Sequence, residues 1–355
     1  MAEIIGAGVT HAPGLLAPME TQGEGIVRAT RHKRAPAEWA DNPQAWPAPL
    51  REEFGDDNGV AAGISHRNRI ADAYHKVRAA IDEFDPELVI VFSDDQHENF
   101  NEQLVPAFAV YAYDEVVSKP FGRMYVGKGD NYWGEPPDKE FTYKGHREAG
   151  IYLANKLIEA GFDMPYSYRP LQAEKGLAHG HANTMLLLDD ERKGWDYPTI
   201  YIHINCHGER FISGHGVGGF LQEGVLPDPM SPTPKRCFEL GQAVGKIISE
   251  SPWRTAIVGS SSWSHGSLTS KHHFVYPDVE MDRVRVERLK AGDFTYFRDL
   301  TGPDLDDSGE NEMRNWCALL GAMHETGNEI EFLDWVESWI FNSSKALALF
   351  HPAVR

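Results

Sequence analysis

The sequence contains few cysteines, and those it has are far apart. Its 355 residues include only three, at Cys206, Cys237 and Cys317. An odd number at such wide spacing does not fit a disulfide framework, and no CxxC pair of the kind that holds structural zinc is present. Free thiols are typical of a reducing compartment, so we expect a cytoplasmic protein.

Long apolar runs and an excess of basic residues are also missing. No stretch approaches the roughly 18 apolar residues that a membrane span requires, and the first residues, MAEII, do not resemble a signal peptide. Lys and Arg number 34 against 53 Asp and Glu, which gives a formal net charge of −19. Nucleic-acid affinity depends on clustered Lys and Arg. The composition therefore predicts no nucleic-acid partner and no membrane partner.

Several common catalytic motifs are absent. The sequence has no GxGxxG after an expected strand, no GxxxxGK[ST] and no HExxH. The serine-rich stretch 259–264 does not fit the GxSxG nucleophile elbow. A metal-free hydrolase that uses Ser262 or Ser264, with His265 as the base, remains an alternative hypothesis.

The residues that are present indicate one soluble α/β unit. Hydrophobic residues make up 41% and charged residues 25%, which are ordinary shares for a globular protein. Apolar runs alternate with stretches of helical periodicity, a pattern that favours a largely buried sheet. We expect a single α/β domain over 1–355, with loop excursions near 20–57, 118–143 and 208–234. The expected strands are 3–9, 88–92, 105–113, 199–204 and 255–258, and the expected helices are 65–84, 146–160, 234–249, 311–324 and 331–349.

Histidines follow three of the expected strands. His11, the pair Gln96/His97 and His265 each come directly after a strand. Open α/β folds build their sites at that edge of the sheet. Two histidines and a carboxylate are the ligands of many non-heme Fe(II) sites, and three protein ligands also suit catalytic zinc. A lone strand-end histidine is more often bonded to a nearby carbonyl, so the pattern alone leaves a metal site open.

Six segments, in order along most of the chain, resemble the class III extradiol ring-cleavage dioxygenases, in particular the catalytic subunit of protocatechuate 4,5-dioxygenase. The resemblance implies an α/β domain with a central mixed sheet flanked by helices. The segments are EIIGAGVTHAPGL (3–15), PELVIVFSDDQHENF (86–100), GLAHGHANT (176–184), RCFELGQAVG (236–245), VGSSSWSHG (258–266) and SGENEMRNWCALLGAM (308–323).

The resemblance implies roles for four residues at matching positions. His11, in the THAPG turn, and Glu312, in ENEMRNW, match metal ligands. His265, in SWSHG, matches the acid–base histidine, and His179, in AHGH, matches a second active-site histidine after a similar strand. Composition alone would not select Glu312, because a glutamate in the first turn of a helix usually stabilises the helix dipole.

The second histidine ligand is where the sequence departs from the family. The family pattern is Asp-His with a phenylalanine four residues later. Counting back from Phe100 without a gap places Gln96 at the ligand position, whereas a one-residue shift places His97 there. We favour His97, because imidazole is a better iron ligand than an amide oxygen. Gln96 and His66 remain alternatives.

The function implied by the resemblance is Fe(II)-dependent opening of a catechol-type ring with O2, in which both oxygen atoms are inserted. His265 would accept a phenolic proton and later return it, and His179 would assist. The expected substrate is a small aromatic diol or aminophenol. A non-redox zinc hydrolase or a binding protein on the same scaffold is the alternative, favoured if Gln96 is the ligand.

The resemblance also implies a homo-oligomer, and it leaves the need for a small partner subunit undecided. The excursions 20–57 and 118–143 could take the place of such a subunit. Arg147, Lys175 and Arg314 are candidates for binding a substrate carboxylate, although a surface salt bridge is the more common role for each.

Overall fold

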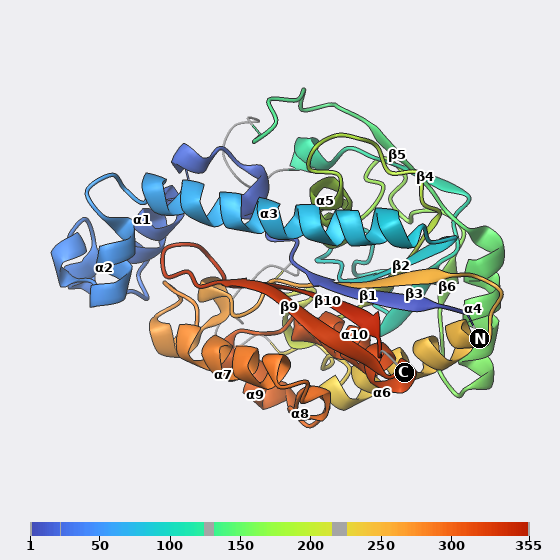
Figure 1. Ribbon diagram of the computed structural model, residues 1–355. Helices are drawn as coiled ribbons and strands as arrows, with labels where there is room; N and C mark the ends of the chain where they lie inside the picture. The colour runs from blue at the N-terminus through green and yellow to red at the C-terminus, as the bar shows by residue number, and fades with distance from the viewer. Residues whose placement is uncertain (1, 22, 124–130, 215–225, 354–355) are drawn as a thin grey trace.

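Eight strands form one mixed sheet at the centre of the protein (Figure 1). The computed structural model describes residues 2–21, 23–123, 131–214 and 226–353. The strand order is β6-β3-β7-β2-β8-β1-β10-β9, with the four central strands from β7 to β1 parallel. The single α/β domain with a mixed sheet is therefore confirmed. The strands are β1 (Ile4–Val9), β2 (Leu88–Ser93), β3 (Phe108–Tyr111), β6 (Tyr166–Ser167), β7 (Thr199–Ile204), β8 (Thr255–Ser260), β9 (Asn328–Val336) and β10 (Lys345–Pro352).

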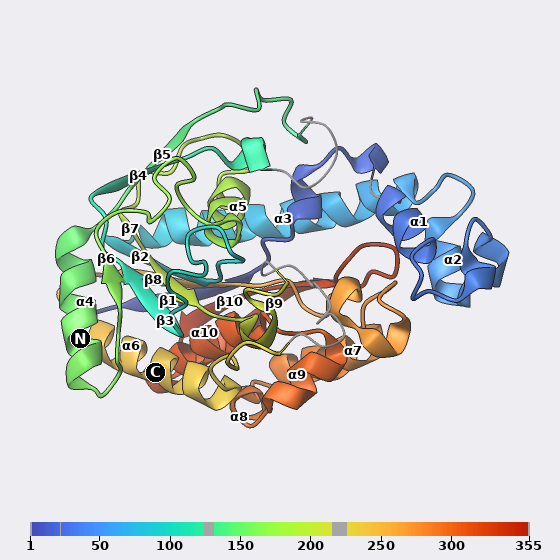
Figure 2. The same ribbon diagram turned by 180° about the vertical axis from the view of Figure 1, so that it is seen from behind.

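Helices cover both faces of this sheet. Along β2, Val89 and Val91 pack into the core on the α3 side, whereas Ile90 and Phe92 pack into the core beneath α6 and α10. Strands buried on both faces read as continuous apolar runs, which is why β2 could be predicted from the sequence. Figures 1 and 2 show α3 (Val60–Phe84) and α5 (His179–Leu188) on one side, and α4 (Arg147–Glu159), α6 (Pro234–Ser249) and α10 (Met313–Thr326) on the other.

Helix α3 is the longest element and carries part of the site. Ile70, Tyr74, Val77 and Ile81 recur every three or four residues and are fully or almost fully buried, as a one-sided apolar stripe requires. The Tyr74 hydroxyl donates a hydrogen bond to the carbonyl of Thr10, just after β1. This contact fixes the chain immediately before His11.

Two of the three predicted excursions contain more regular structure than expected. Residues 20–57 include α1 (Glu24–Thr30) and α2 (Ala48–Phe54), whose apolar residues form a separate small core with Ile340 and Phe341. The second excursion begins and ends in the two-stranded sheet of β4 (Glu115–Ser118) and β5 (Phe141–Lys144). Its residues 124–130 lie outside the described residues, as do 215–225 of the third excursion.

Three features of the chain differ from the prediction. The expected helix 331–349 is wrong, because this segment contributes to the antiparallel pair β9 and β10. Residue His179 begins helix α5 and does not follow a strand. The polar stretch after the fifth predicted strand also contains three helices that were not predicted. These are α7 (Val279–Lys290), α8 (Phe294–Arg298) and α9 (Gly302–Ser308).

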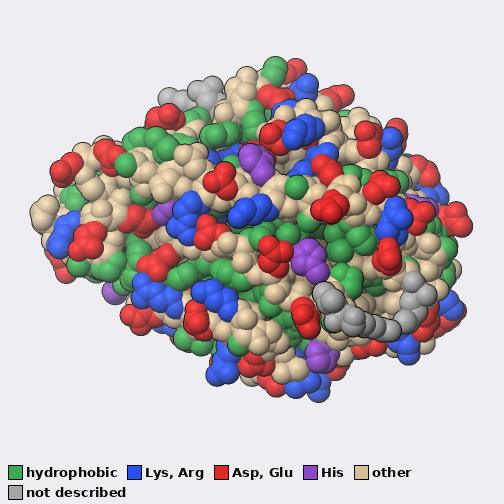
Figure 3. Space-filling model, viewed as in Figure 1, with side chains coloured by type: hydrophobic (Ala, Val, Ile, Leu, Met, Phe, Trp, Pro, Cys, Tyr) green, Lys and Arg blue, Asp and Glu red, His purple; other side chains and the backbone are tan. Residues whose placement is uncertain are grey.

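Charge is spread over the surface. On the face shown in Figure 3, Lys and Arg side chains lie among Asp and Glu side chains. Within the described part of the chain, none of the helices combines the length and apolar character needed to cross a bilayer.

Candidate metal centre

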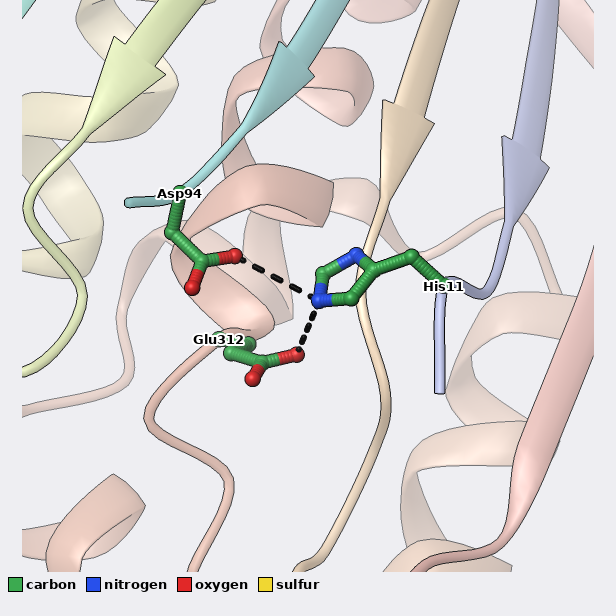
Figure 4. A group of neighbouring side chains, drawn as sticks. All are labelled: His11, Asp94 and Glu312. Atoms are coloured by element: carbon green, nitrogen blue, oxygen red, sulfur yellow. Dashed lines mark ion pairs between the residues drawn. The ribbon is translucent and has the colours of Figure 1, made fainter. Parts of the chain in front are cut away.

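Two strand ends and one helix start bring three side chains together. His11 follows β1, Asp94 follows β2, and Glu312 is the N-cap residue of α10. Strands β1 and β2 both pair in parallel with β8, so their carboxyl ends lie at the same edge of the sheet. Figure 4 shows the three side chains pointing toward one another from these elements. We call this group the metal cluster.

The metal cluster is buried and dense in negative charge. His11 Nε2 lies 3.1 Å from Glu312 Oε2 and 3.6 Å from Asp94 Oδ1. One ligand atom from each residue lies within 4.8 Å of the others. Neither carboxylate pairs with a lysine or arginine among the described residues. Burying two carboxylates costs several kcal/mol each unless positive charge accompanies them, and a divalent cation would supply that charge.

His11 is oriented for metal binding by its neighbours. Its Nδ1 lies 3.2 Å from Ser260 Oγ and 3.4 Å from Ser93 Oγ. A proton on Nδ1, donated to either serine, would leave the lone pair of Nε2 free. Nε2 is buried against the two carboxylates, and it makes no hydrogen bond of good geometry with any described residue. A buried nitrogen without a partner is uncommon and calls for an explanation, which a cation in the cluster would provide.

Gln96 lies at the cluster and His97 does not. The side-chain nitrogen Nε2 of Gln96 donates to Asp94 Oδ2 and to Glu312 Oε1, both at 3.0 Å. Residue His97 has a left-handed backbone with φ of 68°, and its Nε2 lies 3.1 Å from Glu102 Oε1. Among the described residues, Gln96 lines the cavity beside the cluster and His97 does not.

The other alternative, His66, also lies apart from the metal cluster. Its Nε2 is 3.1 Å from Glu53 Oε1, and its ring packs edge-on against Phe341 with centroids 5.0 Å apart. It lines the same cavity as the cluster, but it belongs to a different group of side chains.

Two further histidines lie against the carboxylates, and one of them was not predicted. His265 Nε2 lies 3.3 Å from Glu312 Oε1, in accord with its expected place in the site. His207 Nε2 lies 3.6 Å from Asp94 Oδ2 and 3.7 Å from Glu312 Oε1. Its buried Nε2 makes no hydrogen bond of good geometry with any described residue. The available signal was its position three residues beyond β7, at the same edge of the sheet.

Residue His179 is paired with a buried glutamate. Its Nδ1 lies 3.1 Å from both carboxylate oxygens of Glu98, and its backbone N–H donates to Glu98 Oε1. The His179 ring packs edge-on against the His11 ring, with centroids 5.5 Å apart. Burial alone lowers the pKa of His179, but Glu98 more than offsets this effect and raises the pKa to about 9. His179 is therefore a cation at neutral pH.

The two cluster carboxylates are ionised. Burial and the neighbouring Glu312 raise the pKa of Asp94, but His207 and His11 outweigh them and bring it to about 2. Burial also raises the pKa of Glu312, whereas His265 and His11 hold it well below its usual value. Both groups thus offer charged oxygens to a cation at neutral pH.

A cavity of about 420 Å³ opens beside the cluster. Its lining includes Gln96, His179, His207, His265 and Glu312, together with apolar residues from α3 and from the chain after His11. The space is large enough for a single aromatic ring with a side chain.

The serine alternative is not supported by the geometry. Ser262 Oγ lines the cavity region but has no hydrogen-bond partner, and Ser264 Oγ donates to the carbonyl of Ser308. Neither hydroxyl is bonded to His265, as an activated nucleophile requires.

The residues predicted to bind a substrate carboxylate lie elsewhere. Arg147 pairs with Asp114 on the surface. Lys175 donates to the carbonyl of Glu98. The Arg314 guanidinium donates to three backbone carbonyls, and none of the three candidates is among the described residues that line the cavity.

Comparison with known proteins finds similarity to ring-opening dioxygenases. Residues 229–348 match the family described as the catalytic LigB subunit of aromatic ring-opening dioxygenase. Two relatives are named 2,3-dihydroxyphenylpropionate/2,3-dihydroxicinnamic acid 1,2-dioxygenase. The protein from Photorhabdus laumondii is 27% identical over 211 residues, which cover 59% of this chain and about half, 53%, of the relative. The protein from Burkholderia vietnamiensis is 24% identical over 339 residues, which cover 82% of this chain and 92% of the relative.

These matches agree with the arrangement of the site. The matched region includes His265 and Glu312, and the longer alignment extends over most of the sheet. The resemblance deduced from the six sequence segments is thereby confirmed. Residues 229–348 are thus similar to the LigB subunit family, and most of the chain aligns with proteins that are named as dioxygenases of aromatic diols.

Proposed function

We propose that the protein is a metal-dependent extradiol dioxygenase that opens an aromatic diol with O2 and inserts both oxygen atoms into the product. One observation carries the proposal. A buried imidazole nitrogen faces two ionised carboxylates that pair with no lysine or arginine among the described residues, at the wall of a cavity the size of an aromatic substrate. The LigB-family match supports the same class of reaction.

The side chains that would hold the metal are His11, Asp94 and Glu312. Nitrogen and carboxylate oxygen together suit Fe(II), and the family favours iron over zinc. When bound, Fe(II) would supply Lewis acidity toward a diol hydroxyl and electrons toward O2. Gln96 would hold both carboxylates in position through its two hydrogen bonds. His207 Nε2, close to the far oxygens of both carboxylates, is available as an additional ligand or as a hydrogen-bond donor.

Two histidines have the positions needed to move protons. His265 lies against Glu312 at the cavity wall, where its imidazole can accept a proton from a diol hydroxyl and return it later. Residue His179 carries its proton at neutral pH because of Glu98, so it would act as a hydrogen-bond donor to developing negative charge on an oxygen atom. The two histidines would thus have different tasks.

The proposed substrate is a single-ring aromatic diol. Both reported relatives are named for diols that carry a short acidic side chain. An aminophenol has the same pair of neighbouring donor atoms and belongs in the same substrate test. A zinc hydrolase or a binding protein on this scaffold would contain a metal but would consume no oxygen.

Metal analysis and oxygen uptake together test the proposal. Protein purified without air and reconstituted with Fe(II) should contain about one iron per chain and consume O2 with catechols. The His11→Ala variant should lose both properties. Bound zinc without oxygen uptake after iron reconstitution would support the hydrolase or binding alternative instead.

We also propose a cytoplasmic location and a homo-oligomeric assembly. All three cysteines are buried and unpaired, which fits a reducing compartment. The assembly follows from the family resemblance alone. Light scattering on the purified chain would test it, and a monomer at micromolar concentration would contradict it.

A further inference from the structure

The cavity beside the metal cluster is lined by basic residues, although the protein as a whole is strongly acidic. Three basic side chains, Arg28, Arg67 and Lys345, line it, and Glu312 is the one acidic residue among the described lining residues. The whole sequence has 53 acidic residues against 34 Lys and Arg. Once a divalent cation offsets Glu312 and Asp94, the remaining charge of the lining is positive. Such a lining favours an anionic ligand.

Only Arg67 among these three is both buried and incompletely paired. Arg28 is exposed and pairs with Glu24. The Lys345 ammonium donates to the carbonyl of Ser343. Arg67 is 1% exposed, and among the residues that the structure describes its Nε and Nη1 have no hydrogen-bond partner. Buried guanidinium N–H groups are costly to leave unpaired. A ligand with an acceptor at this position would remove that cost.

The rest of the Arg67 side chain is held in place. Its Nη2 donates to Asp190 Oδ1, and its Cζ lies 4.1 Å from the ring centroid of Tyr132. The Tyr132 N–H in turn donates to the carbonyl of Leu16, five residues beyond His11. Asp190 occupies one of the five N–H groups of the planar guanidinium. The remaining N–H groups can donate to a carboxylate. A guanidinium fixed in this way loses little entropy when it binds a ligand.

Arg67 also lies at a useful position relative to the metal cluster. Tyr74, which holds the chain before His11, is seven residues further along α3, or roughly 10 Å along the helix axis. Ile70 lies between them on α3 and lines the cavity. An aromatic substrate whose ring lies at the metal cluster would therefore pack along the apolar wall formed by Ile70. Its short side chain would point toward Arg67.

We propose that Arg67 binds the carboxylate of the substrate, so that the preferred substrate is an aromatic diol with a short acidic side chain. The inference rests on the proposed function, because it concerns the substrate of the same cavity. Its observations are separate, since they concern the N–H groups of Arg67 that Asp190 leaves without an acceptor among the described residues, and not the metal cluster.

Binding of substrate fragments to the metal-free protein tests this assignment without any ring cleavage. The probes are 3-phenylpropionate, which has the carboxylate but no diol, and 3-phenylpropan-1-ol, its neutral counterpart, both measured by calorimetry. We expect the acid to bind about tenfold more tightly or better, the effect of one charge-assisted hydrogen bond. Arg67→Met should abolish the preference, and Arg67→Lys should lose most of it because lysine lacks the planar fork.

The matched control is Arg69→Met, on the same helix. Arg69 pairs with Asp334 at the surface and does not line the cavity, so this variant should keep the preference for the acid. Equal binding of the two probes, no binding of either, or a preference that survives in Arg67→Lys would overturn the assignment. Acid binding without oxygen uptake would leave it standing while the proposed function fails. Ring cleavage of catechols without preference for the acid would support the proposed function and overturn the assignment of Arg67.

Discussion

The metal cluster and Arg67 lie at one cavity, and each has buried polar groups without a suitable partner. The cluster would be completed by a cation and Arg67 by an anion. The cluster gathers Asp94 and Glu312 without a lysine or arginine partner, whereas Arg67 has buried N–H groups without an acceptor, in each case among the described residues. Each is costly in the protein alone and would be satisfied by a ligand of the opposite charge. A metal ion would complete the first and a carboxylate the second. Under the proposed function, the cavity would bind two different partners of one reaction.

The largest expected effect separates the two positions completely. Glu312→Gln preserves the volume of the side chain but removes one cluster charge, so metal affinity should fall by at least about 100-fold, since even outer-shell partners account for about 10 to 100-fold. Oxygen uptake should disappear. Binding of 3-phenylpropionate to the metal-free variant should stay as in the unaltered protein. Calorimetry with Fe(II) and with the acid measures both, and parallel loss of the two affinities would show that the positions are not independent.

A smaller effect should distinguish two neighbouring residues of the cluster region. Gln96→Ala removes both hydrogen bonds that hold Asp94 and Glu312, so we expect metal affinity to fall by about 10-fold to 100-fold. His97→Ala should change it by less than about twofold, because His97 interacts with Glu102 outside the cavity lining. The outcome against this account is a larger loss in His97→Ala than in Gln96→Ala.

Replacing Arg67 should alter substrate preference without altering the metal. In Arg67→Met, KM for a diol with a propionate side chain should rise by about tenfold, and KM for unsubstituted catechol should stay unchanged. Iron content should equal that of the unaltered enzyme. Steady-state oxygen uptake with the two substrates provides the test. An equal rise in KM for both would point to a structural role for Arg67 and not to carboxylate binding.

The smallest effect concerns the protonation of His179. Glu98→Gln removes the charge that raises the pKa of His179 to about 9, so its NMR titration midpoint should fall by more than about one unit. Because the folded pKa is raised, the stability from this pair is complete below the unfolded pKa of about 6.5 and is lost as pH rises through about 9. The matched control is Glu102→Gln, which should leave that midpoint unchanged.

The sequence revealed the fold class and part of the site, for physical reasons. Strands buried on both faces, such as β2, are continuous apolar runs, and α3 has a clear helical period. The segment that forms β10 was misread as helix, because a short apolar run buried on both faces has no alternation to distinguish it. His11 and Glu312 could be placed from the family resemblance.

The missed site residues depend on tertiary contacts. Asp94 was interpreted as a turn or helix cap, which is the usual role of aspartate after a strand. His207 followed a strand but had no motif around it. Arg67 belongs to the exposed-looking polar pattern of α3, and only the packing of Tyr132 and Asp190 shows that it is buried. The turn at His97 likewise depends on a backbone angle that residue types do not specify.

Anomalous diffraction at the iron edge, on crystals prepared without air and soaked in Fe(II), tests the central claim most directly. The account predicts one peak per chain, bonded to His11 Nε2 and to carboxylate oxygens of Asp94 and Glu312, with Gln96 beside it. A peak coordinated by His97, or no peak at these three residues, would contradict it.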